Sequence, residues 1–275
     1  MRLFLCLVGS LLTVAPLSAQ GDSTVSHAAP ASTAAHHIAA GDSAGQMHPD
    51  VALRHYQAAL AVDSLSYEAN WKAARAIADV AKQIQGNADS LKHRRDSLYS
   101  VGKTYAERAV RADSTQADGH YVLAMVLGRW SRTKSSKERV KYAKIIYDEA
   151  TRAIEINPNH DNAHHVLGAW NAEVKRLSGF TRFFAKTLYG GGFMSKANWP
   201  DAVSHLQKAI EINPQHIYHR LELAQVFDDL EQYSKAREQL QVIPTLPERD
   251  VLDAQYKQDA AKLLDQIKDK KDKTS

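Results

Sequence analysis

Apolar residues recur at steps of three and four positions along most of this chain, the spacing that places them on one face of an α-helix. Two such faces stand near its end, one through Leu221, Ala224, Phe227 and Leu230 and the next through Tyr233, Ala236, Leu240 and Ile243. No proline interrupts residues 51–157, and the alternation of apolar and polar residues that indicates a strand is missing. The pattern predicts an all-α fold.

A short motif is repeated along these helices. Ala-Ile-Glu-Ile-Asn-Pro occurs at residues 153–158 and again at 209–214, and the looser form Ala-x-x-x-Asp-Ser occurs at 59–64 and 109–114. Ten positions after each copy stands a small residue: Ala74, Ala124, Gly168 and Ala224. A pattern that recurs at such intervals is typical of a helical solenoid.

The order Leu-Ala/Gly-x-x-aromatic, then Tyr-x-x-Ala-x-x-x-Leu, then Pro resembles the tetratricopeptide repeat. The small residues are expected where helix A of a repeat closely approaches its helix B, and Asp63, Asp113, Asn157 and Asn213 are expected to end helix B. The copies are 50, 44 and 56 residues apart, where the usual period is about 34. We therefore predict a tetratricopeptide-like helical-hairpin solenoid of about four lengthened repeats.

The extra length falls between helix A and helix B of each repeat. In the first two full repeats it is expected to lengthen the helices, with turns near residues 86–89 and 131–133. In the third repeat it is a distinct insertion over residues 174–199.

Residues 1–19 have the three parts of a secretory signal peptide: Arg2, an apolar middle, and a small-residue end at Ala19. We expect cleavage near Ala19, export to the periplasm of a Gram-negative-type bacterium, and no transmembrane segment in the mature chain. Cys6 is the sole cysteine and would leave with the leader, so that packing alone would hold the fold.

Composition divides the rest of the chain. Residues 20–47 are rich in Ala, Ser and His with few large apolar residues, which predicts a flexible linker. Residues 48–267 form the predicted repeat domain, and the charged tail 268–275 is expected to fray into solvent.

The insertion over residues 174–199 is the most aromatic stretch of the chain and carries four positive and no negative side chains between Lys175 and Tyr189. Its aromatic residues either complete the core or form a basic, amphipathic lid for an anionic ligand or a bilayer. The candidates for such a lid are Lys175, Arg176, Phe180, Arg182, Phe183, Phe184, Lys186 and Tyr189.

Around this insertion the chain resembles the regulator of microtubule dynamics family. The resemblance is carried by Leu167-Gly168-x-Trp170, the turn Lys-Arg-Leu-Ser at 175–178, and Ala202, Leu206 and Ala209. It implies a tetratricopeptide domain that, in one branch of the family, binds phospholipid. An exported protein would not meet tubulin in its own cell, so the resemblance does not imply microtubule binding here.

The sequence contains no nucleophile elbow, phosphate-binding loop, dinucleotide motif or cysteine pair, which predicts a non-enzymatic protein without a cofactor. His160 and His164 stand one helical turn apart and are weak metal-ligand candidates. His216 and His219 take similar places in the next repeat, which favours a role in packing. Asp161 is expected to cap the helix.

The concave face of the solenoid is the predicted binding surface. By analogy with tetratricopeptide domains it is lined from helix A by Trp71, Arg75, Asp79, Tyr121, Met125, Arg129, Asn162, His165, Glu173, Tyr218, Gln225 and Asp229. The formal net charge of +4 is close to balance, so no nucleic-acid partner is expected. We predict a scaffold that binds a protein or peptide, with phospholipid or amphiphile binding by the insertion as the alternative.

Overall fold

The structure, a computed structural model, describes residues 33–177 and 191–273. The chain divides into residues 1–31 and residues 32–275, and every helix described below belongs to the second unit. The leader-like residues 1–19 lie outside the described residues.

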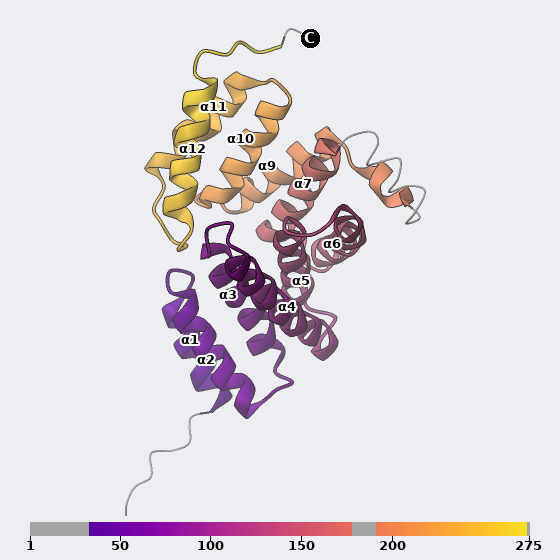
Figure 1. Cartoon of the computed structure of the whole chain (residues 1–275), viewed down its shortest axis with the longest axis vertical. Helices are drawn as coiled ribbons and strands as arrows, with labels where there is room; N and C mark the ends of the chain where they lie inside the picture. The colour runs from indigo at the N-terminus through magenta and orange to yellow at the C-terminus, as the bar shows by residue number, and fades with distance from the viewer. Residues whose placement is uncertain (1–32, 178–190, 274–275) are drawn as a thin grey trace, which may run out of the picture. The chain divides into compact units, whose positions relative to one another are not determined.

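The described helices form successive hairpins (Figure 1). The paired helices are α1 (Ala34–Ala44) with α2 (Pro49–Val62), α3 (Tyr67–Gln83) with α4 (Asp89–Ala112), α5 (Ala117–Ser131) with α6 (Ser136–Ile156), α7 (Asp161–Arg176) with α9 (Trp199–Ile212), and α10 (Ile217–Asp229) with α11 (Tyr233–Val242). α12 (Asp253–Ile267) packs on the last hairpin, and the 3₁₀ turns η1 (Gly191–Lys196) and η2 (Ile243–Thr245) stand between helices.

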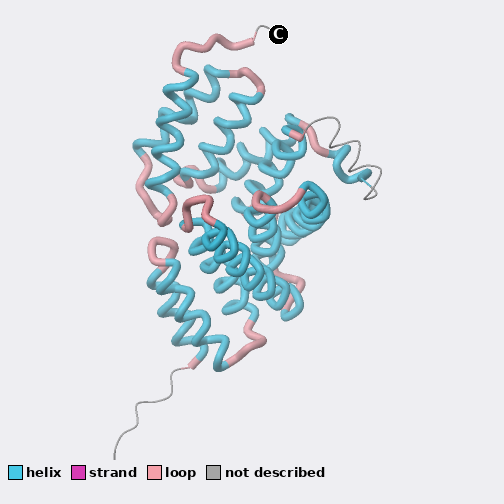
Figure 2. The backbone as a smooth tube through the Cα atoms, in the orientation of Figure 1, coloured by secondary structure: helices cyan, strands magenta, loops and turns pink. Residues whose placement is uncertain are grey.

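These hairpins confirm the predicted fold class. The described part of the chain contains helices and loops but no strand (Figure 2). α3, α5, α7 and α10 are the four predicted A-helices, and the long α4 and α6 account for the extra length of the first two repeats. None of the described helices is both long and apolar enough to cross a membrane.

The repeated motif ends four helices in the same way. Asp63, Asp113, Asn157 and Asn213 are the C-caps of α2, α4, α6 and α9, each donating its backbone N–H to the carbonyl of the alanine four positions earlier. Asp63, Asp113 and Asn157 also accept, through a side-chain oxygen, the backbone N–H two residues on. The repeated alanines Ala59, Ala109, Ala153 and Ala209 are fully buried. The predicted helix stops are therefore confirmed.

The small residues of helix A also lie where the repeat predicts. Ala74, Ala124 and Ala224 are fully buried. At Gly168 of α7, a β-carbon would lie 2.7 Å from Leu206 Cγ and 3.1 Å from the carbonyl oxygen of Ala202, both on α9. Close contact between the two helices of a repeat therefore requires alanine or glycine at this position of helix A.

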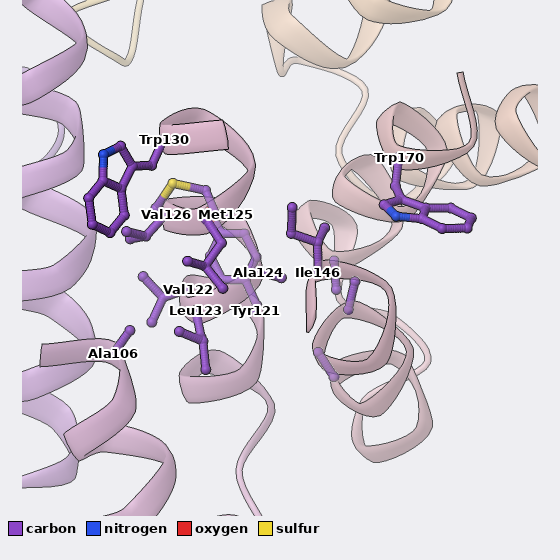
Figure 3. Packing of buried hydrophobic residues seen from close by; sticks show 14 of the residues in the cluster. Ala106, Tyr121, Val122, Leu123, Ala124, Met125, Val126, Trp130, Ile146 and Trp170 are labelled. Atoms are coloured by element: carbon purple, nitrogen blue, oxygen red, sulfur yellow. The ribbon is translucent and has the colours of Figure 1, made fainter. Parts of the chain in front are cut away.

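The core is centred on α5, whose residues 121–127 are all buried. Figure 3 shows the side chains of residues 121–126 and of Trp130 on α5, with Ala106 of α4 and Ile146 of α6. A helix that is apolar on most of its circumference is covered on several sides, and α5 accordingly contacts α3, α4, α6 and α7.

The predicted flexible linker over residues 20–47 is wrong for its second half, which forms α1. Thr33 caps this helix by accepting the backbone N–H of His36. Gly41 lies against the ring of Tyr56 on α2, and the Tyr56 hydroxyl donates to Asp42 at 2.9 Å. α1 has a single large apolar residue, the buried Ile38, and otherwise packs by close approach of its backbone to α2.

The described part of the tail also differs from the prediction, because it folds back on the last hairpin. The backbone N–H of Lys273 donates to the carbonyl of Glu231 at 3.0 Å, and Asp272 accepts the backbone N–H of Ser234 at 2.8 Å. Arg237 donates to the carbonyls of Ile267 and Lys270. These contacts hold residues 268–273 in place.

Two glycines of the A-helices give a matched test of this packing. Gly168→Ala should destabilise the protein by about 1–2 kcal/mol, because the cost of overpacking exceeds the gain in helix propensity. Gly128→Ala on α5, where a β-carbon meets nothing within 4 Å, should instead stabilise it by about 0.5–1 kcal/mol. Urea unfolding measures both, and two changes of the same sign would contradict the proposed helix contact.

Candidate functional site

The inner faces of the A-helices surround a cavity of about 250 Å³. Nine of the twelve predicted groove residues line it: Arg75, Asp79, Tyr121, Met125, Arg129, Asn162, His165, Glu173 and Tyr218. They come from α3, α5, α7 and α10, so the structure brings together residues that the sequence spreads over four repeats.

The C-terminal part of the domain covers one side of this cavity. The backbone N–H of Val251 donates to the carbonyl of Gln46, in the turn of the first hairpin, at 3.1 Å. Lys82 of α3 hydrogen-bonds the hydroxyl of Tyr256 on α12, whose ring stacks on Tyr218 with centroids 4.4 Å apart. The predicted open groove is thus a partly enclosed cavity, because the segment before α12 meets the first hairpin and α12 itself meets α3.

One end of the cavity is rich in charge. Arg129 donates to the buried carboxylate of Asp79 at 2.5 Å. Burial lowers the pKa of Lys82 to about 7, and its ammonium lies 4.4 Å and 4.5 Å from the ring centroids of Tyr218 and Tyr256. Burial raises the pKa of Asp250, which also lines this end, to about 6. The aromatic rings stabilise the ammonium through their negative faces.

The opposite end is apolar, with walls of Val140, Ile146, Trp170, Val174 and Met194 from α6, α7 and η1. The indole N–H of Trp170 donates to the carbonyl of Ala143 at 2.8 Å, which fixes the ring against α6. The cavity therefore offers charged groups at one end and an apolar wall at the other.

Buried histidines connect α7 and α10 beside the cavity. His165 and His219 approach through their Nδ1 atoms at 3.1 Å, and His219 Nε2 lies 3.3 Å from the carboxylate of Asp161. Burial lowers the pKa of His165 well below its usual range and also lowers that of His219. Burial alone would raise the pKa of Asp161, but hydrogen bonds from His219 and Asn213 hold it well below its usual range.

The two weak metal-ligand candidates have structural partners. His160, rather than the expected Asp161, caps α7 by accepting the backbone N–H of Ala163 at 3.2 Å. His164 contacts His205 through Nδ1 at 2.9 Å and the carbonyl of Pro158 through Nε2 at 3.0 Å. Within residues 33–177 and 191–273, no three His, Cys, Asp or Glu side chains are grouped to hold a metal ion.

Three predicted groove residues lie elsewhere. Trp71 lines a separate hollow of about 190 Å³ between the first hairpin and α3, because α1, which the prediction lacked, covers that part of the face. Gln225 and Asp229 do not line the large cavity. Asp229 lies at the end of α10 and binds Arg176 at 2.6 Å.

The described lid candidates are also only partly as predicted. Arg176 is paired with Asp229, Glu173 and Glu222 between α7 and α10, so it joins two repeats and is not free for an anionic ligand. Lys175 is the C-terminal neighbour of the cavity-lining Val174. Phe180, Arg182, Phe183, Phe184, Lys186 and Tyr189 lie outside the described residues.

Sequence reasoning missed Lys82, Arg132 and Tyr256, which all line the cavity. Lys82 and Arg132 stand three positions after Asp79 and Arg129 on or beside the same A-helices, and this spacing could have identified them. Nothing local to residues 253–267 indicates that Tyr256 meets α3, because that contact depends on closure of the whole solenoid.

A family model described as Regulator of microtubule dynamics protein 1-3 matches residues 35–268. The chain belongs to this family. Bovine regulator of microtubule dynamics protein 1 is 26% identical over 210 residues, which are 76% of this chain and 64% of the relative. Protein 3 of Rattus norvegicus is 24% identical over 194 residues, 70% of this chain and 40% of that relative. The chain thus matches about two fifths to two thirds of the length of these relatives.

Solved structures independently support the fold. A thermophilic tetratricopeptide protein from Thermus thermophilus superposes with a TM-score of 0.56, at 18% identity, over 84% of this chain and 98% of its own. At that identity the likeness concerns the fold alone. This member of the regulator of microtubule dynamics family is therefore a helical repeat protein of the tetratricopeptide type, an architecture used for protein interactions.

The buried histidines predict a loss of stability in acid. Burial and the neighbouring His219 lower the pKa of His216 to about 3, while the unfolded side chain titrates near 6.5. As pH falls, the unfolded chain therefore binds the proton first, and this protonation favours unfolding. The contribution of His216 to the free energy of unfolding is at its full value above about pH 7.5 and is lost as pH falls below about 6.5.

His216→Phe keeps the ring that stacks on His219, with centroids 3.9 Å apart, and removes the titrating group. The free energy of unfolding of the variant, measured relative to that of the wild type, should rise by roughly 1.4 kcal/mol as pH falls from 7.5 to 5.5. Urea midpoints measured across this range test it. A difference that stays constant with pH would mean that His216 titrates normally in the folded protein.

Proposed function

We propose that this protein is a non-enzymatic scaffold that holds an extended segment of a partner protein in the cavity. The observation that carries the proposal is the convergence of Arg75, Tyr121, His165 and Tyr218, each from a different A-helix, on one hollow. Side chains at recurring positions of successive repeats are the means by which solenoids bind extended ligands.

The size of the cavity favours the end of a chain over a docked helix. An α-helix with its side chains is about 10–12 Å across, and pockets for drug-sized ligands measure about 300–1,000 Å³. A cavity of about 250 Å³ suits one or two residues of an extended segment, with the remainder passing over the rim.

The polar groups of the cavity support binding rather than catalysis. Asp79 is paired with Arg129, and His165 contacts His219, whose other nitrogen faces Asp161. Each carboxylate or imidazole in these pairs is held by a structural partner, whereas general-base catalysis requires one that faces a reacting group.

Gly128 allows the cavity to be filled without disturbing its walls, because it lines the cavity and a β-carbon there meets nothing within 4 Å. Gly128→Trp should lose at least tenfold in affinity for N-acetylated tetrapeptides selected from a random library, while Gly128→Ala should bind them like the wild type. Isothermal titration measures affinity, and thermal melting checks that both variants fold. Equal binding by all three proteins would place the peptide site elsewhere.

A second candidate function, binding of an amphiphile, is supported by the apolar wall of Val140, Ile146 and Trp170 opposite the charged end. In this alternative an acyl chain lies along that wall. Export of the mature chain, with the leader removed, is part of both proposals.

Native mass spectrometry of the protein isolated from its own cells tests the alternative and export together. The scaffold proposal expects a mass without residues 1–19 and without bound lipid. A stoichiometric lipid that is lost in Gly128→Trp would favour the amphiphile binder. Retention of the leader would contradict cleavage after Ala19.

A further inference from the structure

The cavity lining contains more positive than negative side chains. It includes the cations Arg75, Lys82, Arg129, Arg132 and Arg139, against the carboxylates Asp79, Glu173 and Asp250. Cations that face a partly enclosed cavity have lost much of their hydration, and an anion placed among them restores the lost interaction.

The local pairs do not balance this surplus. Asp79 is taken by Arg129 at 2.5 Å. Glu173 is shared by Arg132 at 3.7 Å, Arg139 at 3.8 Å and Arg176 at 3.1 Å. Arg132 keeps 53% of its side-chain surface accessible although it lines the cavity, so a ligand in the hollow can still reach its guanidinium.

Two cations lack a carboxylate within ion-pair distance among the described residues. Arg75 has no such partner on α3 or on the helices around it. Lys82 is held by the hydroxyl of Tyr256 and by the faces of two tyrosine rings. These rings orient the ammonium without neutralising it, and burial together with the nearby Arg129 and Arg132 lowers its pKa.

We propose that this cationic end, formed by Arg75, Lys82 and Arg132, binds the C-terminal carboxylate of the partner segment. The inference rests on the proposed function and specifies which part of the partner enters. A guanidinium matches the two oxygens of a carboxylate with two parallel N–H groups, and a lysine ammonium adds a third donor.

The residues around the cationic end determine which side chain the C-terminal residue of the partner can have. Tyr121 and Met125 stand beside it, and Trp170 and Val174 form the wall beyond. A terminal residue with an apolar side chain can therefore place its carboxylate among the cations and its side chain on that wall. A small volume favours a chain end, since an internal acidic residue would require two strands of backbone to enter.

The test compares N-acetylated random tetrapeptides with a free C-terminal carboxylate against the same library with amidated ends. The full-length mature protein should retain free-carboxylate peptides with an apolar last residue, and an individually synthesised hit should bind at least tenfold more tightly than its amide. Affinity selection with mass-spectrometric readout identifies hits, and isothermal titration gives each affinity.

Arg75→Gln and Lys82→Met should each reduce that affinity about tenfold or more and bring it close to that of the amide. Both variants should fold, because neither side chain makes an ion pair within the described residues. Lys92→Met on α4, where half of the lysine side chain is exposed, is the matched control and should bind like the wild type.

The outcomes separate the inference from the function on which it rests. If free-carboxylate and amidated peptides bind alike and both are lost in Gly128→Trp, the carboxylate assignment is overturned and the peptide site stands. If neither library binds, both proposals fail. Thermal stabilisation by inorganic phosphate alone, lost in Arg75→Gln and Lys82→Met, would reassign the cationic end to a free phosphate and overturn the carboxylate proposal.

Discussion

Close contact between helix A and helix B at small residues is the constraint on which the rest of this structure depends. Gly168 admits no β-carbon without displacing Leu206 or crowding Ala202, and Ala74 and Ala124 are fully buried. One residue along a helix rotates the side chain by about 100°. The neighbours Arg75, Met125 and Ala169 consequently face the interior and line the cavity. Gln225, the same neighbour in the last repeat, does not line it, so the tight seam between helices sets this cavity-lining position in three of the four repeats.

The sequence predicts the features of this fold that are set locally. A C-cap such as Asn157 and a buried alanine such as Ala153 depend on a few neighbouring residues, so their repetition predicted the hairpins. The analogy with tetratricopeptide domains then supplied nine of the cavity residues. α1 was missed because a helix that packs through Gly41 and one large apolar residue, Ile38, has the composition of a linker. The contact of Lys82 with Tyr256 was missed because it joins the first full repeat to the last helix, and no local pattern records such a contact.

Several polar groups are buried on the inner face of this solenoid, where removing them from water costs free energy. His165 and His219 are buried and neutral, and Asp79 and Arg129 have been removed from water as a pair. Replacing such groups with apolar residues is often neutral or stabilising. Helix packing therefore does not explain their presence, whereas the proposed recognition of a charged ligand would. The apolar seam between helices and the polar inner face have separate roles.

Closure across the cavity determines how a ligand can enter. The C-terminal segment meets the first hairpin through one backbone hydrogen bond, from Val251 to Gln46, and meets α3 through the contact of Lys82 with Tyr256. A ligand that lies along the whole concave face would have to separate these elements and lose both contacts. One that enters end first leaves the backbone contact intact and only replaces the hydroxyl beside Lys82 with a stronger acceptor. The closed arrangement therefore favours the end of a chain, and a charged end over a neutral one.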